Sequence, residues 1–126
     1  MKLARWIFGI AGIYGILVIA PLYFMEARIG RDDPPAITHP EYFYGFVGSA
    51  LVWQIVFLVI AREPARFRPL MLVSVLEKLA WGIPAIVLFQ QQRASGTTLG
   101  FGSIDLLLGA LFLVAFFATS RARTGN

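Results

Sequence analysis

The sequence predicts an all-α membrane protein, folded as one antiparallel bundle of four transmembrane helices. Of the 126 residues, 58% are hydrophobic and 14% are charged, and the mean hydropathy is +0.72. Soluble domains are less apolar and carry about 25% charged residues. The apolar residues also form four long segments, and a bilayer core of about 30 Å needs about 20 helical residues to cross it.

The four segments take up nearly the whole chain, so residues 1–126 form a single domain. Strands of a membrane barrel would alternate apolar and polar residues over about ten positions, whereas these segments are apolar on every side. Helices are therefore expected at residues 6–25, 42–61, 69–89 and 99–119. The first is expected to remain as an anchor, because it is longer than the apolar region of a signal peptide.

The loops indicate where each helix begins. The first, EARIGRDDPPAITHPEY, contains several prolines and is expected to be extended or turned until Pro40, which suits the first position of a helix after Thr38 or His39. The short turn AREPARFRP makes the second and third helices neighbours. The turn QQQRASGTT ends in residues that are candidate N-caps for the fourth helix.

Orientation follows from the basic residues in the short loops, because cytoplasmic loops of membrane proteins carry an excess of Lys and Arg. One side has seven such residues and the other has three. The two groups are Lys2, Arg5, Arg62, Arg66, Arg68, Arg121 and Arg123 against Arg28, Arg31 and Arg93. Both termini are therefore predicted to be cytoplasmic, and the net charge of +4 reflects a surface against anionic lipid, not one that binds nucleic acid.

Polar residues interrupt the apolar segments at similar depths. In LMLVSVLEKLAWGIPAIVLF, Glu77 and Lys78 lie about 16–18 Å from the outer boundary at a rise of about 1.5 Å per residue. Gln54 and Tyr14 reach the same depth, and Asp105 lies about 9 Å down the fourth helix. A charge at mid-membrane costs about 2.5–3.5 kcal/mol on insertion scales, so such groups usually face the protein interior.

Adjacent helical residues are about 100° apart, so Glu77 and Lys78 are expected to find partners on other helices. We expect Glu77 to turn inward and meet Gln54 and Tyr14. Lys78 is expected at the edge, where it either pairs with Asp105 or extends along lipid toward the cytoplasm. A hydrogen-bond network that holds the helices together and a ligand site explain these residues equally well.

If the residues form a ligand site, they divide into polar contacts, aromatic walls and a group at the outer mouth. The polar contacts are Glu77, Gln54, Asp105 and Lys78; the walls are Tyr14, Trp53, Trp81 and Tyr44; the mouth has His39, with Glu41 and Glu26.

The residue types exclude several chemistries. The chain has no cysteine, which excludes disulfides, thiolate chemistry, iron–sulfur clusters and covalently attached haem. A single His is too few for a His-rich metal site, so neither a metal nor a cofactor is expected. Glu77 with Asp105 or His39 could supply the acid and base of an isomerase, but no catalytic motif fixes their geometry. An enzyme is the least supported class.

Three stretches carry a family resemblance: HPEYFYGFVGSALVWQ, RPLMLVSVLEKLAWG and FGSIDLLLGALFLVAF. With these, the chain resembles small uncharacterised bacterial inner-membrane proteins that have a DoxX-like four-helix layout. The resemblance implies a place in the bacterial inner membrane and, through the association of DoxX-like proteins with redox complexes, a quinone-like ligand. In helix number and buried acids, the chain is more loosely similar to the sterol-isomerase and sigma-2-receptor type of bundle.

Three functions are compatible with these observations. The first is binding of a hydrophobic small molecule or membrane lipid in a polar-lined pocket of the bundle. The second is an accessory subunit that packs against a larger membrane protein, whose polar network the charged pair would complete. The third is a proton-coupled transporter that acts as a homodimer or larger homo-oligomer.

The predicted orientation can be tested by labelling. Because the chain has no native cysteine, Asp33→Cys introduces a single thiol, and we expect a membrane-impermeant reagent to modify it from outside the cell. A reporter fused after Asn126 should be active only in the cytoplasm. Labelling of residue 33 only after the inner side is opened would overturn the orientation and the depths derived from it.

Overall fold

A computed structural model describes residues 2–124 of the chain and the side chains of residues 2–119. The basic residues Arg121 and Arg123, which entered the orientation argument, lie outside the described side chains. All regular elements in this part of the chain are helices. They are α1 (Lys2–Ile19), the 3₁₀ helix η1 (Ala20–Phe24), α2 (Glu26–Asp32), α3 (Pro40–Arg62), α4 (Arg68–Gln90) and α5 (Gly96–Thr124).

Within residues 2–124, four helical segments are long and apolar enough to cross a membrane, which indicates a multi-pass membrane protein and confirms the helical prediction at that level. The segments are Lys2–Phe24, Pro40–Arg62, Arg68–Gln90 and Gly96–Thr119. Each begins or ends a few residues beyond the predicted span. Arg, Lys and Gln are good helix formers, so the helices continue past their apolar part into the polar ends.

Prolines shape the helix ends as expected. Pro40 is in the first turn of α3, with His39 at the N-cap position. Near Pro21 the backbone changes from α1 to the 3₁₀ helix η1, because Pro has no N–H to donate to the carbonyl of Leu17. Ser95 caps α5, since its Oγ accepts a hydrogen bond from the Thr98 N–H at 3.3 Å.

The first loop differs from the prediction, because part of it is the helix α2 instead of an extended or turned segment. Its sequence EARIGRD is rich in good helix formers, and Arg28 and Asp32 form an i, i+4 ion pair at 3.5 Å. The prolines at positions 34 and 35 then prevent the helix from continuing. The prediction gave these prolines too much weight over the residues before them.

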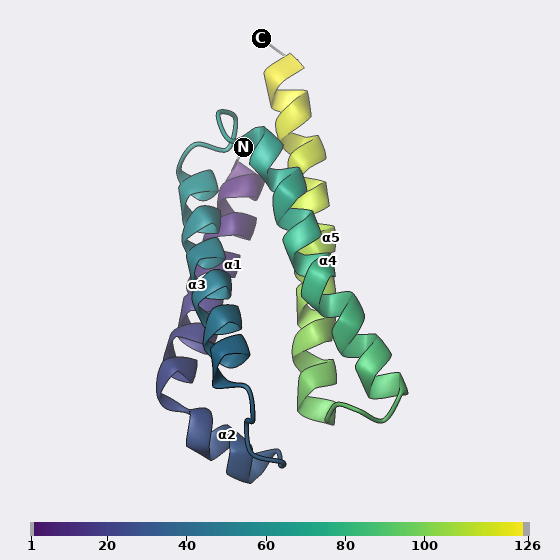
Figure 1. The fold of residues 1–126 in the computed structure, drawn as a ribbon. Coiled ribbons are helices and arrows are strands. Elements are labelled where there is room, and N and C mark those ends of the chain that lie inside the picture. Colours follow the sequence, from purple (N-terminus) through teal and green to yellow (C-terminus); the bar gives the residue numbers. More distant parts are fainter. Residues whose placement is uncertain (1, 125–126) are drawn as a thin grey trace.

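The long helices pack as two pairs, α1 with α3 and α4 with α5 (Figure 1). Glycines allow the backbones of each pair to approach closely. A Cβ atom on Gly12 of α1 would lie 2.9 Å from the Gln54 carbonyl oxygen of α3. One on Gly102 of α5 would lie 2.6 Å from Ala85 Cβ of α4. Each pair therefore depends on the absence of a side chain at its contact.

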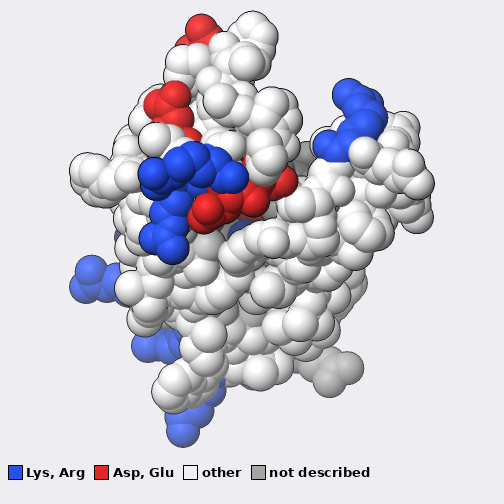
Figure 2. Space-filling view, turned by 90° about the horizontal axis from the view of Figure 1, so that it is seen from below, with Lys and Arg blue, Asp and Glu red and all other residues white. Residues whose placement is uncertain are grey.

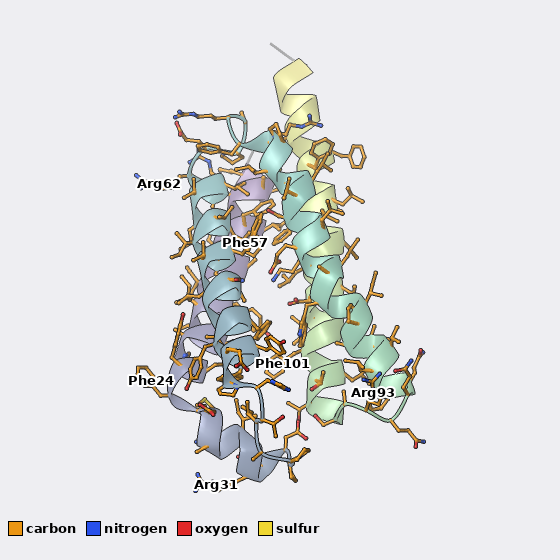
Figure 3. All side chains as sticks on the ribbon, viewed as in Figure 1. Phe24, Arg31, Phe57, Arg62, Arg93 and Phe101 are labelled. Atoms are coloured by element: carbon orange, nitrogen blue, oxygen red, sulfur yellow. The ribbon has the colours of Figure 1, made fainter. Side chains whose placement is uncertain are left out.

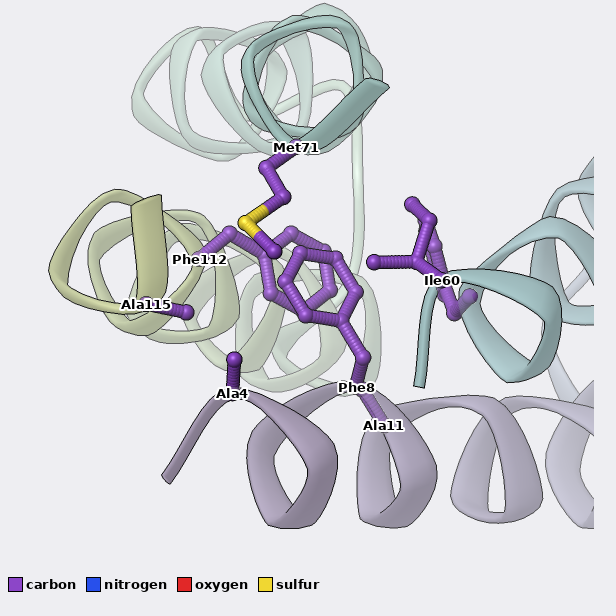
Figure 4. Packing of buried hydrophobic residues seen from close by; sticks show 8 residues of the cluster. Ala4, Phe8, Ala11, Ile60, Met71, Phe112 and Ala115 are labelled. Carbon is purple, nitrogen blue, oxygen red and sulfur yellow. The ribbon is translucent and has the colours of Figure 1, made fainter. Parts of the chain in front are cut away.

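The two pairs meet in an aromatic core, formed by Phe8, Phe57 and Phe112. These rings are fully buried, and the centroid of Phe112 lies 4.2 Å from that of Phe8 and 4.9 Å from that of Phe57. Met71 of α4 packs in the same cluster (Figure 4). Residues from all four long helices thus join the pairs near the end where α1 begins and α5 ends, called here the terminal end.

Toward the other end, called here the α2 end, the ribbons of the two pairs diverge (Figures 1 and 3). Ser95, before α5, donates a hydrogen bond from Oγ to Asp33 Oδ2 at 3.2 Å and so links the loops of the two pairs. Seen from this end, the molecule presents charged side chains of both signs (Figure 2). The long sides carry exposed apolar residues such as Leu17 and Leu76, as a lipid-facing surface requires.

Two glycines of α5 test the close contact between α4 and α5. Gly102→Ala places a methyl against Ala85, and we expect a loss of about 1–3 kcal/mol of stability from overpacking. Gly100 has open space around it, so Gly100→Ala should be neutral or stabilising by up to about 1 kcal/mol through helix propensity. Unfolding of both variants in detergent measures the difference, and equal stability would contradict the close contact.

Candidate functional site

The charged residues in the middle of α4 lie beside a buried stripe of that helix. The buried residues of α4 are Met71, Ser74, Lys78, Gly82 and Ala85. Their spacing of three or four residues places them on one face, which packs against α5. Lys78 belongs to this stripe, whereas Glu77 lies at its edge and is only partly buried.

Lys78 is the centre of a charged cluster, formed by Glu77, Lys78 and Asp105. Its ammonium Nζ lies 3.5 Å from Asp105 Oδ1 and 3.6 Å from Glu77 Oε2. It also lies 5.0 Å from the centroid of the Phe57 ring, a distance at which a cation is attracted to an aromatic face. The cluster therefore rests on the aromatic core and joins α4 to α5.

The prediction that Glu77 turns inward while Lys78 lies at the edge is wrong, because the side chain of Lys78 is 4% exposed and that of Glu77 is 17% exposed. The expectation that both need partners on other helices also fails for Glu77, which pairs with its neighbour. The 100° between adjacent residues separates their Cβ atoms, but these long side chains converge on one space. The pair of Lys78 with Asp105, one of the two arrangements expected for Lys78, is present.

A glycine makes room for the lysine. A Cβ atom on Gly109 of α5 would lie 3.3 Å from Lys78 Cβ, so the stem of Lys78 passes α5 where that helix has no side chain. Asp105 lies one turn earlier on the same helix, within reach of the ammonium. The spacing of Asp105 and Gly109 thus provides both the space and the counter-ion for Lys78.

Two carboxyl groups share one ammonium in this cluster. The side chains of Glu77 and Asp105 remain 17% and 20% exposed, and the buried Glu77 Oε2 has no hydrogen-bond donor among the described residues. An unsatisfied acceptor at this depth is costly. The cluster can therefore accept a hydrogen bond or a proton from a group that reaches it.

Gln54 belongs to a different contact. Its side chain is buried against Gly15 of α1, and its Nε2 donates to the Ala50 carbonyl of its own helix at 2.8 Å. Its Oε1 finds no donor in the described part of the chain. The expected meeting of Gln54 with Glu77 is not formed, because Gln54 faces α1 and not α4.

Tyr14 is half-buried on α1, six residues after Phe8 of the aromatic core.

The predicted aromatic walls divide into two groups. Trp81 stacks on Phe46 at 6.0 Å between α4 and α3, and Trp53 contacts Phe57, which also contacts Lys78. These two tryptophans flank the region of the charged cluster.

Tyr44 and His39 lie at the α2 end. Tyr44 donates a hydrogen bond to Glu26 Oε1 at 3.0 Å. His39 is exposed, with its Nδ1 3.4 Å from Glu41 Oε1, and its ring stacks on Tyr42. The nine predicted residues therefore do not form a single site: Gln54 packs on α1, and Tyr44 and His39 lie at the α2 end, apart from the charged cluster.

Comparisons with known protein families, with curated proteins and with solved structures found no match to this chain. The DoxX-like resemblance stays a prediction. Among residues 2–124, no group of three or more His, Cys, Asp or Glu side chains is placed to hold a metal ion.

Removing the ammonium tests the charged cluster. We expect Lys78→Met to lower stability by about 3–5 kcal/mol, because two buried carboxylates lose their cation. Adding Asp105→Asn should restore part of this loss, since the two positions are coupled. Unfolding in detergent measures both effects.

The exposed pair of Arg66 with Glu63, at 3.3 Å, provides a control. Arg66→Met should change stability little, because exposed ion pairs contribute about 0–1 kcal/mol. A double variant of Lys78 and Asp105 no more stable than Lys78→Met would show that the pair does not stabilise the fold.

Proposed function

We propose that this protein lies in the bacterial inner (cytoplasmic) membrane with both termini in the cytoplasm, as an antiparallel four-helix bundle that binds a hydrophobic small molecule or lipid. The observation that carries the proposal is the charged cluster. It is placed in the middle of the spans and is partly accessible, and Glu77 Oε2, which lies 3.6 Å from its ion partner Lys78 Nζ, has no hydrogen-bond donor among the described residues.

A purely structural role explains the cluster less well. An ion pair that only joined α4 to α5 would need one carboxylate, and Asp105 supplies it. The second carboxylate, Glu77, adds a charge at a depth where exposure to lipid costs about 2.5–3.5 kcal/mol. A bound group that donates to Glu77 would remove this cost, so binding accounts for a residue that helix packing alone does not require.

The surroundings favour a ligand with a ring and a polar substituent. Trp81 with Phe46, and Trp53 with Phe57, provide flat apolar surfaces near the cluster, and such surfaces suit aromatic or conjugated rings. A quinone-like molecule meets both demands. Its carbonyl would accept from Lys78, and the hydroxyl of its reduced form would donate to Glu77.

The partial exposure of the cluster suggests the route of access. Glu77 and Asp105 keep 17% and 20% of their side-chain surface exposed, whereas Phe8, Phe57 and Phe112 close the terminal end. A hydrophobic molecule dissolved in the bilayer would reach the cluster from the side. Water-soluble substrates would have no comparable apolar approach.

An accessory role or a proton-coupled homo-oligomer is the second candidate, and the same acceptor favours it. A polar side chain from a larger membrane protein, or a proton exchanged during transport, would satisfy Glu77 Oε2 equally well. Purification without any partner, with ligand binding retained by the isolated protein, would separate the first candidate from the second.

Binding can be measured through the tryptophans beside the cluster. In a Trp6→Phe background, which removes the exposed tryptophan of α1, binding of a short-tailed benzoquinol, the reduced form that can donate to Glu77, should change the emission of Trp53 and Trp81. We expect Glu77→Leu to weaken binding by about tenfold or more, which corresponds to about 1.4 kcal/mol. Glu77→Gln should weaken it less, because the amide keeps a hydrogen-bonding group.

Ser103→Ala is the matched control. Ser103 is exposed on α5, and its hydroxyl donates to the Leu99 carbonyl of its own helix at 2.8 Å, so its removal should leave binding unchanged. Equal affinity of the parent and a correctly folded Glu77→Leu protein would refute the cluster as the polar contact of a ligand.

A further inference from the structure

A pocket at the α2 end lies apart from the charged cluster. Its volume is about 600 Å³, and it is bounded by η1, α2, the following loop and the first turns of α3. The side chains that give it chemical character are Tyr23, Glu26, Arg31 and Tyr44. The pocket thus brings together an anion, a cation and two aromatic rings.

The carboxylate in this pocket has a fixed position. Glu26 Oε1 accepts a hydrogen bond from the Tyr44 hydroxyl at 3.0 Å, which links the start of α2 to α3. The rings of Tyr23 and Tyr44 are stacked, with centroids 6.1 Å apart and an angle of 25° between their planes. A carboxylate beside aromatic faces attracts a cationic group, through charge and through the electron-rich rings.

The cation in the pocket is free to bind an anion. Arg31 forms no ion pair within the described side chains, whereas Arg28, on the same short helix, is paired with Asp32 at 3.5 Å. Glu26 and Arg31 lie about 7–8 Å apart along the axis of α2, at about 1.5 Å per residue. A ligand that carries an anion and a cation a few bonds apart would satisfy both.

The position of the pocket relative to the ends of the spans indicates which class of ligand it would bind. The first span ends at Phe24, directly before α2, and Tyr44 lies in the second turn of α3. The pocket therefore lies where the apolar spans end, at the depth of lipid headgroups, and tyrosines are common at this level. Charged residues of both signs lie on this face of the molecule (Figure 2), and Phe24 and Arg31 are both at this end (Figure 3).

We infer that this pocket binds the headgroup of a zwitterionic phospholipid that carries a primary ammonium, as in phosphatidylethanolamine. The ammonium donates to Glu26 and contacts the rings of Tyr23 and Tyr44, and the phosphate binds Arg31. The acyl chains extend along the exposed apolar side of the bundle. This site is separate from the one under the proposed function and does not depend on it.

The chemistry of the pocket discriminates among headgroups. A choline headgroup cannot donate a hydrogen bond to Glu26, because its nitrogen has no hydrogen. A glycerol headgroup offers the phosphate for Arg31 but no cation for Glu26, so the carboxylate opposes the net negative charge of that lipid. Only the ethanolamine headgroup satisfies the carboxylate, the rings and the guanidinium together.

The test compares lipids that differ only in their headgroup. The full chain, delipidated in mild detergent, is titrated with phosphatidylethanolamine, phosphatidylcholine and phosphatidylglycerol of identical acyl chains, and bound lipid is counted by native mass spectrometry. We expect the ethanolamine lipid to bind about tenfold more tightly than the other two. Equal binding of the three lipids by the unaltered protein would overturn the inference, whatever the variants do.

Variants then assign the two charges. Glu26→Gln should abolish the preference for ethanolamine over glycerol, and Arg31→Gln should weaken both lipids. Tyr44→Phe, which removes only the hydroxyl that orients Glu26, should reduce the preference about twofold to threefold.

Arg28→Gln is the matched control, because Arg28 lies on the same helix and is not part of the pocket. It should leave all three affinities unchanged. If Arg28→Gln weakens binding as much as Arg31→Gln does, the basic character of α2 and not the pocket holds the lipid, and the inference fails.

Discussion

A lysine in the middle of a membrane-spanning helix imposes the strictest demand on this fold. In hydrocarbon an ammonium is expensive unless counter-ions surround it, and Lys78 has Asp105 and Glu77 within 3.6 Å. Asp105 can reach it only because α4 and α5 approach closely, which Gly102 and Gly109 permit. The close packing of α4 against α5 therefore makes the buried charge possible, and the ion pair in turn joins the two helices.

The rest of the bundle is built from contacts of a different kind. The α1/α3 pair uses glycines against a buried amide, since Gln54 fills the space at Gly15. The two pairs then join through the stacked rings of Phe8 and Phe112, which is an apolar contact without directional polar partners. The buried polar contacts thus lie within each pair, and aromatic packing joins the two pairs at the terminal end.

The sequence predicts the number and placement of the long helices well, because a run of about 20 apolar residues has few alternatives to a membrane-spanning helix. It also predicts the start of α3 at Pro40. It does not predict which neighbour a residue faces. Gln54 packs on α1 and not on α4, because the rotation of a helix is fixed by packing that hydropathy does not record.

A signal for the burial of Lys78 was nevertheless present. Ser74, Gly82 and Ala85 recur with Lys78 at spacings of three and four residues, and small residues on one face of an apolar helix mark a close helix contact. The positions four residues from Glu77 hold the larger Val73 and Trp81. The pocket at the α2 end was harder to anticipate, since it depends on α2, and a helix of two turns gives little periodicity to detect.

The hydrogen bond between Ser95 and Asp33 contributes little to holding the two helix pairs together. It links their loops at the α2 end and is exposed to solvent, so water competes for both partners and the net stabilisation is about 1 kcal/mol. Thermal energy at 25 °C is about 0.6 kcal/mol, so such a bond opens often. Loss of this bond would therefore leave the two pairs joined by the aromatic core and by the stacking of Trp81 on Phe46 between α4 and α3.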